Sequence, residues 1–418
     1  LLWHLWHKGI TGKMFRVLAQ MLDSTPSCVM HNGAFSRVIT PDMGWEQGDT
    51  LATTMFTVFI NSILEEVWAQ HEGVPIPTPA DTNSLATKLV ALMYADDLVG
   101  FATSPARLQA MADHCKAALT KWQLRASVHA TDTSKTAYMK VLGGPVSARL
   151  HAARRAPPTH TNIMWGDVAI PQVSSYKYLG AWVTNTNTWD THLDMRMQSA
   201  DKAAHAHHKA MSQVLLPIHT RKLPLTTVAQ PIVTYAAQVW ARPTKDMQRK
   251  LDSWQAGLAA RAFHCPANTS HMCLQQEIGL VPLHITCELL AMRYWHHLST
   301  TPTDRLLSKI HTAWSGKYHP WAKSVNAMLA KYQVTNTEAL VLSTAQFKIH
   351  LSAKVVDYLR TYWQQPTRKH GPVHERYVSD FGVGETRSAR TRVRSYLREL
   401  TNQPTLAYCR AAELCMHM

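Results

Sequence analysis

Two adjacent carboxylates, Asp96 and Asp97, separate two short apolar runs within residues 88–103. Each run is rich in Leu or Val and contains no proline, which predicts a pair of buried strands. These strands would form a hairpin that carries both carboxylates at its tight connection. Because adjacent residues of an extended chain point to opposite faces, the two side chains can serve one site only if the turn re-aims one of them, or if they take unequal roles.

Carboxylates beside apolar strands are costly unless something offsets their desolvation, and a bound divalent cation does so. Mg²⁺ favours one or two carboxylates together with the phosphates of a substrate, which is the arrangement of two-metal phosphoryl transfer. A solvated hairpin turn is the simpler interpretation of an Asp-Asp pair taken alone, since Asp is common in turns. The rest of the chain has to decide between these two interpretations.

Composition favours a large globular protein with an anionic partner. The chain has 418 residues, 46% of them hydrophobic, which is enough for two or three domains. Its net charge of +15 favours nucleic acid as a partner, although a solvated basic surface is the alternative. The seven cysteines are scattered without a Cys-x-x-Cys pair, which fits a reducing compartment. We expect no membrane association, because no apolar run reaches membrane-spanning length and no signal peptide is visible.

The elements around the carboxylates predict an α+β fold. Their expected order is a hairpin with Asn32-Gly33 at its turn, a helix, the carboxylate hairpin, a second helix that begins at Ser104-Pro105, and a strand. They cover residues 28–40, 51–67, 88–103, 104–122 and 134–141. Such an order predicts an antiparallel sheet with helices on one face.

A second candidate segment is the loop that contains Gln47 and Gly48, directly before the first of these helices. A glycine lets the backbone approach a ligand closely, and a helix N-terminus favours phosphate. A plain glycine-containing loop is the better interpretation of this segment when its neighbours are ignored.

Taken together in this order, these pieces resemble the reverse transcriptases of non-long-terminal-repeat (LINE-type) retrotransposons, from Leu1 to about Leu306. The central match is Tyr94-Ala95-Asp96-Asp97, which is similar to the signature of reverse transcriptases. The other matching motifs are Asn32-Gly33, Gln47-Gly48, Lys135-Thr136, residues 176–180 with their Tyr178-Leu179-Gly180, and residues 277–283.

The resemblance implies a ferredoxin-like polymerase palm with partial fingers, a helical thumb and a mostly helical C-terminal region. We expect the palm and partial fingers at residues 1–145, the connection and thumb at 146–265, and a basic post-thumb region at 266–418. The family acts on nuclear DNA, so a nuclear location is plausible, but the sequence contains no convincing basic import signal.

The resemblance also implies DNA synthesis on an RNA template from a DNA primer, with deoxynucleoside triphosphates and Mg²⁺. Asp96 and Asp97 would be the metal ligands, and Lys135 would neutralise or protonate the leaving pyrophosphate. Gln47 and Gly48 would contact the template–nucleotide pair. The remaining expected contacts, near the primer end, are Tyr94, Tyr178, Leu179 and Gly180.

Two departures from the family pattern suggest an alternative. The first carboxylate motif of the family normally precedes a segment like residues 1–4, so we expect an N-terminally truncated fragment that lacks this ligand. Residues 51–54 replace the Ser-Pro that usually follows the Gln-Gly motif. The alternative is therefore a catalytically inactive, nucleic-acid-binding remnant. An RNA-dependent RNA polymerase is more distant, because its central motif is Gly-Asp-Asp and this chain has Ala95.

Overall fold

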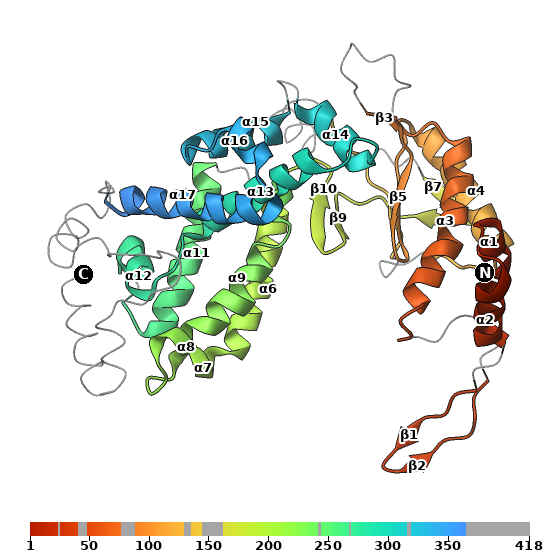
Figure 1. Cartoon of the computed structure of the whole chain (residues 1–418), viewed down its shortest axis with the longest axis horizontal. Helices are drawn as coiled ribbons and strands as arrows, with labels where there is room; N and C mark the ends of the chain where they lie inside the picture. The colour runs from red at the N-terminus through yellow and green to blue at the C-terminus, as the bar shows by residue number, and fades with distance from the viewer. Residues whose placement is uncertain are drawn as a thin grey trace. The chain divides into compact units, whose positions relative to one another are not determined.

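A computed structural model describes residues 1–23, 26–40, 48–76, 88–128, 135–143, 162–240, 244–266, 269–315 and 319–364 (Figure 1). These residues form a mixed structure of helices and short strands that is mostly helical. They divide into two compact units. Unit 1 consists of the described residues within Leu1–Pro77, Asn83–Leu179 and Asn185–Asn187, and unit 2 of those within Gly180–Thr184 and Thr188–Met418.

Unit 1 contains long helices and antiparallel hairpins. Its helices are α1 (Leu2–His7), α2 (Gly12–Asp23), α3 (Ala52–Gln70) and α4 (Pro105–Lys121). Its hairpins are β1 (Met30–His31) with β2 (Ala34–Phe35), β3 (Val74–Pro75) with β4 (Lys88–Leu89), β5 (Ala91–Tyr94) with β6 (Asp97–Gly100), and β7 (Ile163–Trp165) with β8 (Val168–Ile170). The division between the units falls in the connection between β9 (Ser175–Tyr178) and β10 (Ala181–Thr184).

Two local predictions for unit 1 are confirmed. Asn32 and Gly33 both have positive φ, +49° and +80°, as a type I′ hairpin turn requires. Ser104 is the N-cap of α4, where its hydroxyl accepts a hydrogen bond from the amide of Arg107, and Pro105 occupies the first turn. Both features depend only on neighbouring residues, which is why the sequence reveals them.

The strand expected over residues 134–141 is wrong in extent. Within the described part of this segment, pairing is limited to one parallel bridge between Tyr138 and Gln172. The Tyr138 amide donates to the Pro171 carbonyl, and the Val173 amide donates to the Tyr138 carbonyl. The ladder cannot continue past Pro171 because proline has no N–H to donate. The described strands of unit 1 therefore form separate two-stranded sheets and not the single sheet that we expected.

The carboxylate hairpin is anchored to the core of unit 1 through β5. Met93 packs on a cluster that includes Ile60 and Ile63 of α3, and Val90 packs against Met111 of α4. The indole of Trp68 donates a hydrogen bond of 3.1 Å to the carbonyl of Ala91. The base of the hairpin is thus held by α3 and α4, while its tip is exposed.

Unit 2 is helical apart from β10. Its longer helices are α6 (Asp190–Ala206), α11 (Lys245–Phe263), α12 (His271–Ile278), α13 (Leu283–Thr300), α14 (Leu306–Ser315), α15 (Pro320–Lys331) and α17 (Thr344–Gln364). Shorter helical segments are α7 (His208–Ser212), α8 (Ile218–Leu223), a π-helical turn (Pro224–Ala229), α9 (Gln230–Val233), α10 (Ala237–Trp240) and α16 (Asn336–Val341). Across the described helices, no apolar stretch is long enough to span a membrane.

One hydrophobic core organises unit 2. It extends in sequence from Leu193 to Trp363, and α13 at its centre packs against α10, α11, α15 and α17. The boundary that we expected between residues 265 and 266 therefore crosses a continuous core. The strands β7, β8 and β9 belong to unit 1, where β7 and β8 pack on α4. The division between the units therefore lies elsewhere than the boundary expected between 145 and 146, and the expected domains remain predictions.

Candidate active site

The β5–β6 turn places its two carboxylates in different backbone environments. Tyr94 and Asp97 are register partners at the end of the hairpin, so Ala95 and Asp96 form the two-residue connection. Ala95 has φ = +52°, in the left-handed region that residues with a Cβ rarely adopt. Asp96 thus lies in the turn and Asp97 begins β6, which agrees with unequal roles for the two side chains.

Both carboxylates are exposed, and neither makes a hydrogen bond or an ion pair within the described residues. No Lys or Arg of the described part neutralises them, although unit 1 does pair other acids, such as Glu65 with Lys8 and Glu72 with Arg107. Their oxygen atoms are free to take a hard cation. The described residues contain no cluster of three or more His, Cys, Asp or Glu side chains that could hold a metal by itself.

Two tyrosines of β9 lie within the electrostatic reach of Asp97. Burial, and next the negative charge of Asp97, raise the pKa of the Tyr176 and Tyr178 hydroxyls above the ordinary value. The two residues are two positions apart on one strand, so they share a face. Asp97 therefore lies close enough to two phenol groups for its charge to favour their protonated form.

Tyr176 also connects this neighbourhood to Lys135. Its hydroxyl donates a hydrogen bond to the main-chain carbonyl of Lys135. The contact fixes the backbone of Lys135 near the tyrosines, while the residue itself is exposed. The sequence analysis did not select Tyr176, although its spacing from Tyr178 along a strand was the available signal.

The other expected site residues of unit 1 are Gln47, Gly48 and Tyr94. Gln47 lies outside the described residues. Gly48 has φ = +101°, and among the described residues no atom lies within 4 Å of the position that a Cβ would take. Directly after it, the Asp49 carboxylate accepts a hydrogen bond of 2.7 Å from the amide of Leu51, where α3 begins. Tyr94 is 67% exposed at the tip of the hairpin.

Leu179 and Gly180 form the tight turn that follows β9. Both have positive φ, +46° and +78°. Gly180 belongs to unit 2, where its carbonyl accepts a hydrogen bond from the guanidinium of Arg196. Arg196 in turn lies over the ring of Tyr235, at 4.2 Å from the centroid. The turn is therefore fixed by contacts of its own backbone.

A comparison with protein families decides the ancestry of this segment. The family described as "Reverse transcriptase (RNA-dependent DNA polymerase)" matches residues 3–183. Residues 3–183 are, by descent, a reverse transcriptase domain, which is a kind of nucleotidyltransferase domain. No curated protein matches the chain.

The reverse transcriptase domain includes every site residue that the sequence analysis selected, from Gln47 to Gly180. Its end at residue 183 lies in β10, close to the division between the units. The expectation of a reverse transcriptase is thereby confirmed at the level of the family. The non-LTR subtype and the roles of individual residues remain predictions.

Proposed function

We propose that this chain is the polymerase portion of a non-LTR retrotransposon reverse transcriptase, and that Asp96 and Asp97 are its metal-binding carboxylates. The observation that carries the proposal is the exposed, unpaired carboxylate pair at the β5–β6 turn, inside a segment of reverse transcriptase descent. The order of the sequence motifs supports the non-LTR subtype.

The chemistry of this pair fits Mg²⁺, which binds oxygen ligands and commonly uses one or two carboxylates together with substrate phosphates. Bound there, Mg²⁺ would neutralise the triphosphate of an incoming nucleotide and the charge that develops during transfer. By the family resemblance, Asp96 is the first ligand and Asp97 the second. The positive φ of Ala95 supports a turn in which the two side chains take different roles. Both are held by a hairpin whose base is packed on α3 and α4.

The proposed reaction joins a deoxynucleotide to a DNA primer on an RNA template. The primer 3′-hydroxyl oxygen bonds to the α-phosphorus, the bond from that phosphorus to the bridging oxygen breaks, and pyrophosphate leaves. Lys135 neutralises or protonates the pyrophosphate. Gln47 and Gly48 contact the template–nucleotide pair, and Tyr94 packs near the primer end.

The polypeptide outside this hairpin would bind the nucleic acid. We assign unit 1 to the palm with partial fingers, and the first helices of unit 2 to the thumb. Tyr178, Leu179 and Gly180 would lie near the primer terminus. The net charge of +15 supports a partner with many phosphates.

Primer extension tests the assignment. The full chain is incubated with an RNA template, an annealed DNA primer, deoxynucleotides and Mg²⁺, next to a chain carrying Asp96→Ala and Asp97→Ala. Because the chain lacks the family's first carboxylate motif, we expect weak but measurable incorporation by the unchanged chain. The double variant should lose at least about a hundredfold of this activity, as for the removal of a principal electrostatic group. The matched control is Asp167→Ala, an exposed aspartate in the turn of the β7–β8 hairpin, which should keep full activity. Equal incorporation by the double variant would rule out the proposed site.

Iron-mediated cleavage tests the metal site without relying on turnover. Fe²⁺ with ascorbate and peroxide cuts a polypeptide close to the bound ion, so we expect a cut near Asp96 that Mg²⁺ suppresses and the double variant lacks. Absence of this cut would contradict the metal assignment. A chain that binds primer–template with steep salt dependence, but neither cuts there nor extends the primer, would be the inactive remnant.

A further inference from the structure

Unit 2 contains a cavity of about 1150 Å³ that none of the expected polymerase residues lines. Its walls come from α11, α12, α13, α15 and α17. Pockets for small ligands are commonly about 300–1,000 Å³, so this cavity has room for one. Its lining is mixed in charge and contains aromatic rings, which restricts the ligands that suit it.

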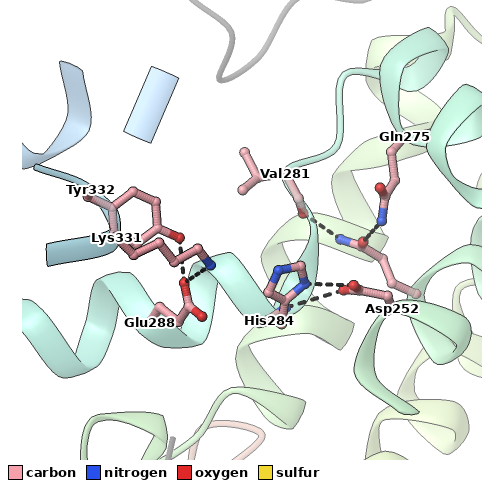
Figure 2. Close-up of polar contacts among 8 residues, drawn as sticks. Asp252, Gln275, Val281, His284, Glu288, Lys331 and Tyr332 are labelled. Atoms are coloured by element: carbon pink, nitrogen blue, oxygen red, sulfur yellow. Dashed lines mark hydrogen bonds and ion pairs between the residues drawn. The ribbon is translucent and has the colours of Figure 1, made fainter. Parts of the chain in front are cut away.

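The floor of the cavity carries a buried carboxylate–imidazole pair. Asp252 Oδ2 lies 2.6 Å from Nδ1 of His284, and its Oδ1 accepts a hydrogen bond of 3.3 Å from the His284 amide (Figure 2). His284 is only 6% exposed. Its other ring nitrogen, Nε2, makes no hydrogen bond within the described residues. One polar atom of a fixed, buried ring thus remains available.

A second carboxylate, that of Glu288, lies on α13 one helical turn after His284. Glu288 is 1% exposed, and its Oε2 accepts hydrogen bonds from Lys331 Nζ, at 2.7 Å, and from the Tyr332 hydroxyl (Figure 2). Because His284 and Glu288 are four residues apart on a helix, they lie on one face, and both line the cavity. Oε2 of Glu288 is used by these two donors, whereas its Oε1 is buried and has no hydrogen-bond partner within the described residues. The unused polar atoms of this wall are therefore Oε1 of Glu288 and Nε2 of His284.

The helix α17 contributes aromatic side chains to the cavity. Tyr358 and Tyr362 both line the cavity, with ring centroids 6.0 Å apart and planes inclined by 26°. The ring of Tyr362 lies 6.0 Å from that of His284. Neither hydroxyl is hydrogen-bonded within the described residues. The cavity therefore has an aromatic wall next to its acceptor wall.

Exposed cations lie at the N-terminal end of α11. Lys245 and Arg249 line the cavity and are solvent-exposed, so they mark its mouth, in contrast to the buried floor. Arg249 pairs only with the exposed Asp246 of its own helix within the described residues, a contact that water weakens. The two cations can therefore turn to an anionic group at little cost.

We propose that this cavity binds one unpaired nucleotide, with its base against Tyr358 and Tyr362 and its phosphate at Lys245 and Arg249. Stacking of a base on aromatic side chains contributes about 1–3 kcal/mol. The acceptors on α13 suit the amino and imino donors of a base, and basic side chains suit phosphate. The ligand is either a free nucleotide or one nucleotide of a single strand. This site goes beyond the proposed polymerase site and does not depend on it.

Calorimetric titration tests the proposal. The full chain carries Asp96→Ala and Asp97→Ala and is kept in EDTA, so that the proposed polymerase site contributes no binding. Nucleoside 5′-monophosphates and the corresponding nucleosides are titrated separately. We expect the monophosphates to bind at least about tenfold more tightly, because only they reach the cations at the mouth. Adding Lys245→Ala and Arg249→Ala should remove that difference and leave nucleoside binding unchanged.

The matched control is Arg360→Ala. Arg360 forms the same i,i+3 ion pair, with Asp357, on an exposed face of α17 and does not line the cavity. This variant should bind monophosphates like the parent chain, whereas Tyr362→Leu should weaken both monophosphates and nucleosides. Circular dichroism of each variant verifies that it is folded.

A short oligonucleotide with one 2-aminopurine separates the two sources of the ligand. If the chain quenches the fluorescence of this oligonucleotide but does not bind free monophosphates, the site takes a nucleotide within a strand. The Lys245→Ala and Arg249→Ala changes should then abolish the quenching. If neither probe binds, or if the mouth variant binds like its parent, the proposal is wrong. Equally strong competition by a phosphotyrosine peptide would also overturn the nucleotide assignment.

Discussion

Asp97 of β6 acts on Tyr178 of β9, where its charge adds to burial in raising the pKa of the phenol. Tyr176, on the same face of β9, responds to Asp97 in the same way. Asp96 is not among the groups that shift either tyrosine. The two neighbouring carboxylates thus differ in their surroundings: the charge of Asp97 reaches two phenols, and Asp96 lies in the turn.

This difference predicts that two single substitutions affect the pKa values of the tyrosines differently. In Asp97→Asn the pKa of Tyr176 and Tyr178 should fall, because a tyrosinate is no longer opposed by a neighbouring negative charge. Asp96→Asn should leave both pKa values unchanged. The measurement is an NMR titration of chains with ¹³Cζ-labelled tyrosine. Tyr138, whose pKa is raised by burial alone, is the internal control. Equal shifts in the two variants would contradict the geometry.

Gly73, directly before β3, is a position where any side chain should damage unit 1. Its φ is +60°, and an added Cβ would lie 2.3 Å from the carbonyl oxygen of Leu89 in β4. We expect Gly73→Ala to lower the free energy of unfolding by about 2 kcal/mol or more, since backbone strain and a clash with main chain combine. Urea denaturation measures the loss. Gly143→Ala is the control, because no atom in the described part of the chain lies within 4 Å of its added Cβ.

His192 of α6 should make unit 2 sensitive to mild acid. It is fully buried, its Nδ1 accepts the Trp182 amide, and its Nε2 donates to the Tyr235 carbonyl. Burial is the main reason that its pKa is lowered below 6.5. The unfolded chain therefore takes up a proton first, so this stabilisation is complete above about pH 6.5 and declines as the pH falls toward the lower folded pKa.

The check is the unfolding free energy of the full chain at pH 7.5 and pH 5.5. In His192→Gln the difference between the two pH values should be smaller than in the parent chain, although the variant is less stable at both. His205→Gln, an exposed histidine of the same helix, should behave like the parent. An unchanged pH difference in His192→Gln would show that this residue does not couple protonation to folding.

The buried carboxylate of Glu288 should depend on its phenolic donor. Tyr332→Phe removes the hydroxyl that donates to Oε2, and we expect a loss of about 1–3 kcal/mol in unfolding free energy. Tyr358→Phe is the matched control, since its hydroxyl has no hydrogen-bond partner within the described residues, and it should change stability by less than about 0.5 kcal/mol. Similar losses in both variants would argue against a specific role of the Tyr332–Glu288 bond.

Local sequence signals anticipated a substantial part of the fold. The Asn32-Gly33 turn, the Ser104 cap and the hairpin around Asp96 depend on residues within a few positions of one another, and the structure contains each of them. The strand over 134–141 failed because its partner segment contains Pro171, more than thirty residues away, and proline ends the ladder. No local pattern reports such a partner.

Residue types, their spacing and the order of the motifs were enough to predict two carboxylates at a tight turn within a reverse transcriptase segment, because these are local properties of the chain. Folding brings the charge of Asp97 within reach of Tyr176 and Tyr178. It also places Asp252, Glu288 and Tyr362 around one cavity, and no local pattern predicts either arrangement. The physical reason is that burial and electrostatic contact depend on packing between distant helices and strands. Hydrophobic burial drives that packing. Because this effect is non-directional, a local sequence pattern does not specify which distant residues come together.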